Sequence, residues 1–290
     1  MKLFLKKIII FITCINLPVV LILIIFPKNY HIGGAELILE YQLQKLKSQK
    51  KIKTAFFGDS SCGNAIDAQL YNNQTINLSL VGAYNLEGSL EMIKKANENF
   101  NSLDTAIIMH TIDVFHRENA KTYKVSDFSY SLIEIFNRNL RIFLKKLFKN
   151  DYKYLFKNKN RISLKYDYLE QEDYTDNYNI MDFSTIVDSV NSAIVDSISN
   201  DNKRSIDNIV KYCDDNGIKY LFLFAPNVEL GKNRYLQSII SYFSFNKYNF
   251  SKNYYKINFK NIGDSNDHVS TLFKKDATKY YKDEIFNFFN

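Results

Sequence analysis

A chain of 290 residues that is 46% hydrophobic can bury a full core, so an intrinsically disordered protein is excluded. With only 9 glycines and 3 prolines the chain has few residues for tight turns, and a β-sandwich is not expected. The net charge is +7, but four lysines and no acid lie in the first 28 residues. The remainder is therefore only mildly basic, and nucleic-acid binding is not indicated.

The first predicted element is a membrane-spanning helix at residues 8–26. This stretch, IIIFITCINLPVVLILIIF, contains no charged side chain, and about twenty apolar residues cross a bilayer core of about 30 Å. A cleaved signal peptide is the alternative, but its apolar region is usually about 7 to 15 residues long and ends in a small-residue cleavage site. The longer run here, which ends in Ile-Ile-Phe-Pro-Lys, favours an uncleaved anchor over residues 1–29.

The lysines around this helix predict its orientation. Three of them precede the apolar run and one follows it, and positive charge is retained on the cytoplasmic side of a membrane. We therefore expect a single-pass protein of the cell membrane with a cytoplasmic N-terminus. Residues 30–290 would form one extracytoplasmic domain, periplasmic or on the outer surface, which contacts the membrane through the N-terminal helix.

After a helix at about 34–49, short apolar runs alternate with longer helical patterns. Such runs are typical of buried parallel strands, and their alternation with helices predicts an α/β fold with a three-layer, doubly wound, mostly parallel sheet. The expected strands are 53–58, 75–80, 105–110, 219–225 and a less apolar fifth run, 254–259. The expected helices are 65–71, 84–97, 192–214, 228–243 and 274–289.

An excursion at about 116–189 interrupts this alternation and is interpreted as a helical insertion. Its segment 131–149, SLIEIFNRNLRIFLKKLFK, places its apolar side chains in one stripe and predicts a basic amphipathic helix. Packing of this helix against the domain is the simpler interpretation. A lid, a partner contact or a membrane-surface contact is the alternative.

Candidate catalytic residues follow the predicted strands, and in open α/β sheets ligands bind at the carboxyl ends of the strands. Ser60 follows the first strand, Gly82 the second and Asp113 the third, whereas His268 follows the last. A serine hydroxyl becomes a nucleophile when a neighbouring imidazole takes its proton and a carboxylate fixes the tautomer of that imidazole. These residue types at one sheet edge are therefore suited to catalysis by a serine nucleophile.

Each of these residues also has a structural interpretation. Ser60, like its neighbours Asp59 and Ser61, could simply cap the next helix, and Gly82 could form a plain turn. Asp113 is expected to brace the loop in which it lies. Two other histidines, His110 and His116, are interpreted as packing or surface residues. His268 lies in a polar loop directly before the last helix, where catalysis is the favoured role.

The blocks resemble those of the SGNH (GDSL-like) hydrolase superfamily, from Thr54 to about Tyr281 with the excursion as an insertion. Residues 58–60, Gly-Asp-Ser, match the first block, whose serine is the nucleophile. Residues 77–83, NLSLVGA, are similar to the second block, and residues 266–281 to the last. The resemblance implies a flavodoxin-like sheet with Ser60 as nucleophile, His268 as general base and the amide of Gly82 as an oxyanion donor.

Two blocks depart from the family pattern. The third, usually G-x-N-D with the Asn donating to the oxyanion, stands here as HTID, so Ile112 replaces the Asn. Since isoleucine cannot donate a hydrogen bond, we expect a slow enzyme or a substitute donor such as Asn85 or Thr111. In the last block the family Asp stands three residues before the His, where this chain has a serine. Asp264, four residues before His268, is the expected orienting carboxylate, and Asp267 is the alternative.

The anchor and the domain together resemble the cell-envelope branch of this superfamily, which includes proteins of alginate O-acetylation and lipoteichoic-acid D-alanylation. The resemblance implies a serine esterase or O-acyltransferase, with acetyl as the expected acyl group and a cell-envelope glycan as substrate. A membrane-bound acyltransferase is a candidate partner. The alternative is a catalytically degenerate scaffold that binds or assembles components of envelope polysaccharide biosynthesis, so enzymatic activity stays open.

No cofactor and no metal is expected. The sequence contains no P-loop, no dinucleotide-binding glycine motif and no metal-binding His or Cys cluster. The three cysteines, Cys14, Cys62 and Cys213, are too few for a disulfide framework. A Cys62–Cys213 disulfide is open, but their spacing does not favour it.

Overall fold

A computed structural model describes the part of the chain that carries the candidate site. The described residues are 6–7, 34–49, 51–100, 103–116, 162–165, 168–171, 197–228, 234–258, 260–263 and 267–290. The chain divides into two compact units, residues 1–37 with 129–160, and residues 38–128 with 161–290. The predicted span at 8–26 and the predicted amphipathic helix at 131–149 lie outside the described residues. Within the described residues, no helix combines the length and the apolar character needed to cross a membrane.

The centre of the second unit is a parallel sheet of five strands, which confirms the predicted α/β class with a mostly parallel sheet. The strands lie in the order β2-β1-β3-β6-β8, so the chain turns from β2 at one edge back across β1 to β3. Their bounds are β1 Thr54–Gly58, β2 Thr75–Asn77, β3 Thr105–His110, β6 Lys219–Phe224 and β8 Phe250–Ser251.

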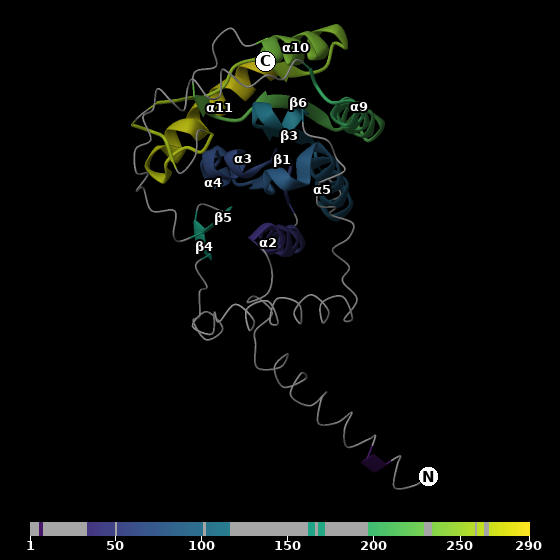
Figure 1. The fold of residues 1–290 in the computed structure, drawn as a ribbon, viewed down its shortest axis with the longest axis vertical. Helices are drawn as coiled ribbons and strands as arrows, with labels where there is room; N and C mark the ends of the chain where they lie inside the picture. Colours follow the sequence, from purple (N-terminus) through teal and green to yellow (C-terminus); the bar gives the residue numbers. More distant parts are fainter. Residues whose placement is uncertain are drawn as a thin grey trace. The chain divides into compact units, whose positions relative to one another are not determined.

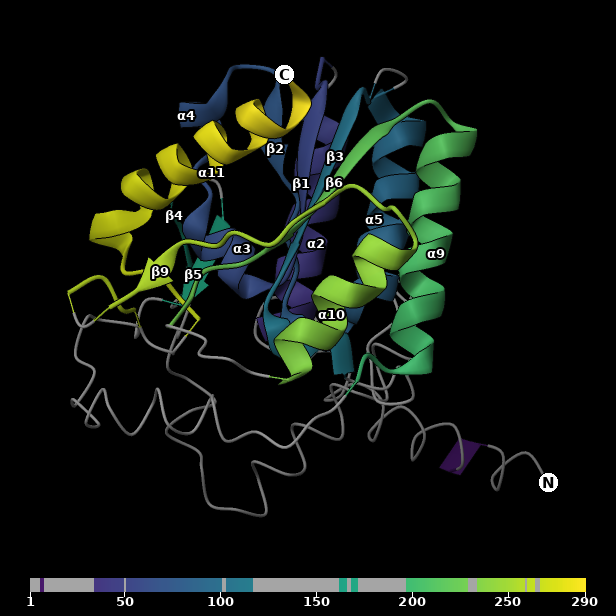
Figure 2. The same ribbon diagram turned by 90° about the horizontal axis from the view of Figure 1, so that it is seen from above.

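Helices lie on both faces of this sheet (Figures 1 and 2). One face carries α3 Ser60–Ala65, α4 Ala68–Tyr71 and α11 Lys274–Phe289, which pack against one another. The other carries α5 Asn85–Phe100, α9 Asn200–Asp215 and α10 Arg234–Phe245. Alternate strand residues fill the two cores, because successive side chains of a strand point to opposite faces. Phe56 and Met109 pack on the α3 side, whereas Phe222 contacts Phe243 of α10 on the other.

Helix α2, Gly34–Ser48, closes the edge of the sheet at β2. The buried Gln42 side chain donates to the carbonyl oxygen of Ser79 at 2.8 Å. The buried ammonium of Lys45 donates to the carbonyl oxygen of Asn77 at 2.5 Å. An edge strand exposes unpaired carbonyl groups, so these two side chains satisfy acceptors that would otherwise lose water without gaining a partner.

Four predicted strands match the central sheet, but the fifth was placed wrongly. The fifth strand of this sheet is β8, which lies before the predicted run at 254–259. That run contains β9 Lys256–Ile257, which instead pairs with β7 Asn227–Val228 in a separate two-stranded sheet. Strands of two residues are too short to leave an apolar run or an alternating pattern.

The helices differ from prediction mainly at their starts. The element expected at 65–71 is two helices, α3 and α4: α3 ends at Ala65, because the backbone of Ile66 is extended, and Asp67 caps α4 by accepting the Gln69 amide at 3.1 Å. α9 begins at Asn200, where the Ser199 side chain caps it. α10 begins at Arg234, since the chain before it first forms β7. α11 spans the predicted residues 274–289.

The remaining elements are short. A hairpin of β4 Ile162–Lys165 and β5 Tyr168–Gln171 lies within the predicted insertion. Three 3-10 turns complete the described chain: η2 Gly82–Tyr84, η3 Ile112–His116 and η6 Thr271–Phe273. Cys62 and Cys213 are both free and buried, so the Cys62–Cys213 disulfide does not form.

Replacing Lys45 by Met should lower the free energy of unfolding by about 1–3 kcal/mol, because the carbonyl of Asn77 is then buried without a donor. Lys47→Met on the same helix is the matched control, since Lys47 is exposed and should change stability by less than about 0.5 kcal/mol. Urea unfolding of the two variants measures the difference. Equal effects would show that the Lys45 contact does not secure the sheet edge.

Candidate active site

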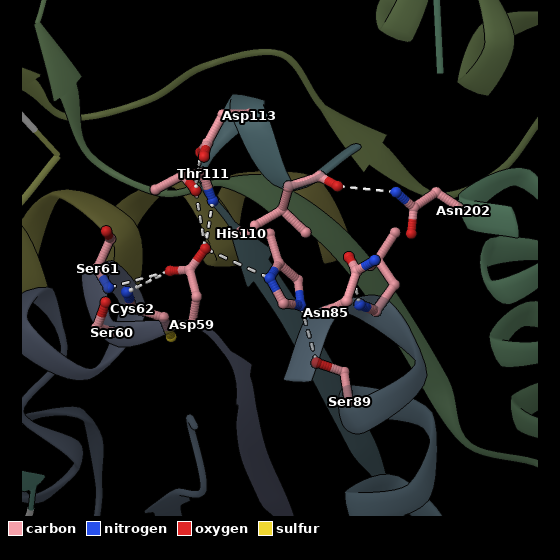
Figure 3. Close-up of polar contacts among 12 residues, drawn as sticks. Asp59, Ser60, Ser61, Cys62, Asn85, Ser89, His110, Thr111, Asp113 and Asn202 are labelled. Carbon is pink, nitrogen blue, oxygen red and sulfur yellow. Dashed lines mark hydrogen bonds and ion pairs between the residues drawn. The ribbon is translucent and has the colours of Figure 1, made fainter. Parts of the chain in front are cut away.

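Asp59 joins the end of β1 to the start of α3 and caps that helix. Its Oδ1 accepts the amide of Ser61 at 3.0 Å and that of Cys62 at 3.4 Å (Figure 3). A carboxylate in this position satisfies amides that have no acceptor within the helix. The capping role considered for Ser60 therefore belongs to Asp59, and the Ser60 hydroxyl is left for another contact.

That contact is made with His268. The Ser60 Oγ lies 2.9 Å from the His268 Nε2, although the two residues are 208 positions apart in the chain. Both side chains are half-buried, which shields the pair without sealing it from a reactant. A serine hydroxyl within hydrogen-bond distance of an imidazole is the arrangement in which the imidazole can act as general base.

A short hairpin-like contact holds His268 in place. Residues Ile262 and Val269 form an antiparallel bridge, and the Gly263 amide donates to the His268 carbonyl oxygen at 2.7 Å. A Cβ atom on Gly263 would lie 2.9 Å from that same oxygen, closer than real Cβ contacts. Glycine is therefore needed at 263 for the backbone of His268 to approach this closely.

Helix α11, which follows His268, is fastened to the helix that begins with Ser60. The buried Lys274 Nζ donates to the Gly63 carbonyl at 2.8 Å. The buried Thr278 Oγ1 lies 3.0 Å from the Ala65 carbonyl. Both acceptors are at the end of α3, where carbonyl groups lack partners and a cation is favourable. These contacts fix the relative positions of the two segments that carry Ser60 and His268.

The carboxylate expected to orient His268 remains a prediction. Asp264 lies outside the described residues. Asp267, the alternative, is described, half-buried and directly precedes His268 in the chain.

The candidate oxyanion donors come from two helix starts. Ser60 is the first residue of α3 and Gly82 the first of η2, positions whose amides have no acceptor within the helix. Hydrogen bonds from Leu78 to Phe56 and from Leu80 to Gly58, of 2.8 and 2.9 Å, continue the pairing of β2 with β1 beyond the end of β2. The chain therefore reaches Gly82 alongside the turn that carries Ser60.

Thr111, one of the two substitute donors expected from the sequence, is engaged elsewhere, whereas the other, Asn85, accepts a hydrogen bond through its side-chain oxygen. The Thr111 amide and hydroxyl lie 2.8 and 3.0 Å from Asp59 Oδ2, and the hydroxyl lies 2.5 Å from Asp113 Oδ1. Asn85 is buried with φ +53°, and its Oδ1 accepts the amide of Leu86 at 2.9 Å. Thr111 and Asp113 thus brace the turn at Asp59. Ile112 is buried and apolar.

His110 is the residue of this region whose role the sequence did not reveal. It is buried, its Nε2 lies 2.8 Å from Ser89 Oγ, and its Nδ1 lies 3.4 Å from Asp59 Oδ2 (Figure 3). The distance between His110 Nδ1 and Asp59 Oδ2 is within the range of an ion pair, but the two atoms are not aligned for a hydrogen bond. The available signal was its place at the carboxyl end of β3, the same sheet edge as Asp59.

The surroundings of Asp59 favour its charged form. Burial alone would raise the pKa of this carboxyl, but His110 and the two donors of Thr111 outweigh burial and lower the pKa to about 2. By contrast, burial raises the pKa of the Cys62 thiol to about 12, so this neighbour of Ser60 is not a thiolate nucleophile. Among the described residues, no group of three or more His, Cys, Asp or Glu side chains could hold a metal ion.

In comparisons with known proteins, no protein-family model and no curated protein matches the chain. The similarity to the SGNH superfamily therefore rests on the residues named above.

Replacing Gly263 by Ala should slow the reaction of Ser60 with a serine-reactive fluorophosphonate by about 10- to 100-fold. The added Cβ pushes the His268 backbone away, and misplacing a catalytic group by about 1 Å costs about this much. Gly217→Ala is the control. Because Gly217 has a φ of +66°, this substitution should lower stability by about 1 kcal/mol. Gly217 lies just beyond the end of α9, however, so the substitution should leave labelling unchanged. Equal labelling of the two variants would contradict the role of Gly263.

Asp59→Asn should destabilise the protein at pH 7 and abolish part of its acid sensitivity. Because the folded pKa of about 2 lies below the unfolded value of 3.8, the Asp59 charge stabilises the fold above about pH 4 and this contribution is lost as pH falls toward 2. The shift corresponds to about 2 kcal/mol. Urea unfolding between pH 7 and pH 2 should show that the free energies of unfolding of the native chain and of Asp59→Asn converge at low pH.

The exposed Asp104 provides the control for that experiment, since its ion pair with Lys53 lies at the surface. Asp104→Asn should change stability by less than about 0.5 kcal/mol. If the difference in free energy of unfolding between the native chain and Asp59→Asn stays constant with pH, Asp59 does not titrate as inferred.

Proposed function

We propose that the protein is a membrane-anchored, extracytoplasmic SGNH-like serine esterase or O-acyltransferase. The observation that carries this proposal is the 2.9 Å contact between Ser60 Oγ and His268 Nε2, at the carboxyl edge of a parallel sheet. The capping of α3 by Asp59 supports it, because Ser60 is not needed as a cap. The anchor is residues 8–26, and the three-layer, doubly wound SGNH arrangement accounts for helices on both faces of the sheet.

In the proposed reaction, Ser60 Oγ attacks the carbonyl carbon of an acyl ester while His268 Nε2 takes the hydroxyl proton. The amides of Ser60 and Gly82 donate to the oxygen that becomes negative. When the tetrahedral intermediate collapses, the ester bond to the alcohol breaks and the alcohol leaves with the proton from His268. An acyl group then remains on Ser60.

The second half-reaction decides between hydrolysis and transfer. His268 takes a proton from water or from a sugar hydroxyl, and the oxygen of that molecule attacks the acyl group. The ester bond to Ser60 then breaks, and His268 returns the proton to Ser60 Oγ. Water yields a free acid, whereas a sugar hydroxyl yields a new ester. We propose acetyl as the acyl group, Asp264 as the carboxylate that orients His268 and a cell-envelope glycan as substrate or acceptor. A membrane-bound acyltransferase is the proposed partner for supplying acyl groups across the membrane.

The second candidate function is that of a catalytically degenerate scaffold in envelope polysaccharide biosynthesis. Two observations favour it: the Ile112 side chain offers no donor, and the Thr111 amide donates to Asp59 while the Thr111 hydroxyl lies between Asp59 and Asp113. Without a donor from Asn85, such a site has only backbone amides for the oxyanion, and the loss of one donor typically costs about 100- to 1000-fold in rate.

The two candidates are separated by incubating the purified full-length chain with p-nitrophenyl acetate and with a fluorophosphonate. Ser60→Ala and His268→Gln should each lower ester hydrolysis by about 1000-fold or more, and Ser60→Ala should abolish labelling. Ser61→Ala is the matched control: its hydroxyl is buried without a hydrogen-bond partner among the described residues, so activity should persist.

Absence of labelling at Ser60 in the native chain would reject the enzyme and leave the scaffold. Labelling without hydrolysis would favour a transferase that excludes water, which is then tested by supplying a glycan acceptor with the ester and measuring the acylated glycan.

A further inference from the structure

His110 links the start of α3, which carries the Ser60 amide, to α5, the helix that directly follows the turn of Gly82 (Figure 3). One ring nitrogen lies 2.8 Å from Ser89 Oγ on α5, and the other lies 3.4 Å from Asp59 Oδ2 at the start of α3. All three side chains are buried, with exposed fractions of 1% for His110, 2% for Asp59 and 3% for Ser89. Water does not compete for contacts at this depth, so they are stronger than at the surface.

Each end of this link leads to a candidate donor. Asp59 holds the first turn of α3, whose first amide belongs to Ser60. Ser89 lies one turn into α5, which directly follows the turn η2 that begins at Gly82. The position of the Gly82 amide relative to the Ser60 amide therefore depends on how α5 is held against α3, and His110 contacts both.

The backbone of Asn85, where η2 meets α5, makes this dependence stronger. Its φ of +53° and ψ of −168° are a combination that non-glycine residues rarely adopt. Such a conformation persists only when the surrounding structure holds it. The contact of Ser89 with His110, one turn later in the same helix, supplies such support.

The imidazole ring suits this role because its two nitrogens lie in one rigid plane and point in different directions. An asparagine can place its amide nitrogen near the Nδ1 position only, so it can replace the contact to Asp59 but not the contact to Ser89. This difference allows the link to be cut at one end while the other is kept.

We propose that His110 is a positioning residue that sets the spacing of the Ser60 and Gly82 amides by joining Ser89 to Asp59. This inference rests on the proposed function, in which those two amides stabilise the oxyanion. Because Ile112 offers no side-chain donor, the oxyanion would depend on these two amides, and their spacing then determines the rate.

The test compares p-nitrophenyl acetate with its thionoester, in which sulfur replaces the carbonyl oxygen. Sulfur is a poor hydrogen-bond acceptor, so the thionoester gains little from oxyanion donors. Ser89→Ala and His110→Asn should lower kcat/KM for the oxygen ester by about 10- to 100-fold, a loss below or near that of one full donor. The thionoester should change by less than about threefold, so the ratio of the two rates falls.

Ser238→Ala is the control, since within the described part of the chain Ser238 on α10 bonds only to the Tyr235 carbonyl of its own helix, at 2.8 Å. It should leave the ratio unchanged. A purely structural role of His110 would lower both rates together as protein unfolds, and an unchanged ratio in Ser89→Ala and His110→Asn would overturn the proposal. Ser89→Ala removes only one hydroxyl, so the test stands if His110→Asn does not fold.

A second readout does not depend on turnover. In protein labelled with ¹⁵N at glycine and serine, the amide resonances of both Ser60 and Gly82 should shift in Ser89→Ala and stay in place in Ser238→Ala. If the native chain hydrolyses neither ester but both resonances shift, the proposed function fails and the positioning role of His110 stands. If the resonances of Ser60 and Gly82 do not move, the positioning role fails whatever the activity.

Discussion

The charge of Asp59 is the constraint on which the candidate site depends. This carboxylate is buried, which raises its pKa, yet His110 at the end of β3 and the amide and hydroxyl of Thr111 lower that pKa to about 2. One carboxylate thus caps the helix that begins with Ser60 and ties that helix to the neighbouring strand. A buried charge without such partners would cost several kcal/mol, so the geometry of this turn is strongly determined.

The other end of the Ser60 helix is held in a complementary way. Lys274 and Thr278 of α11 meet its last carbonyl groups, so an anion stands at the start of this six-residue helix and a cation at its end. α11 also follows the segment that carries His268. The contact between His268 and Ser60 is therefore set by buried polar contacts within the fold. Such preorganisation is what a general base requires.

The sequence predicts those parts of the fold that have long or uniform signals. The runs at 105–110 and 219–225 are apolar on both faces because parallel strands are covered by helices on both sides, and β3 and β6 occupy them. Ser60 and His268 could be selected because each follows a strand or precedes a helix. The link through His110 could not be predicted in this way, because it depends on the register of β1 and β3. That register pairs Gly58 with Met109 and so brings the next residues, Asp59 and His110, side by side. Registers between strands about fifty residues apart leave no local pattern in the sequence.

Acyl transfer through Ser60 is the central claim, and the most direct measurement is detection of the acyl-enzyme. The purified chain is mixed with p-nitrophenyl acetate, quenched in acid within the first turnover and digested, and the peptide containing residues 56–66 is analysed by mass spectrometry. The account predicts one acetyl group on Ser60, none on Ser61 and none in Ser60→Ala. An unmodified peptide from the native chain, or equal acetylation in Ser60→Ala, would contradict it.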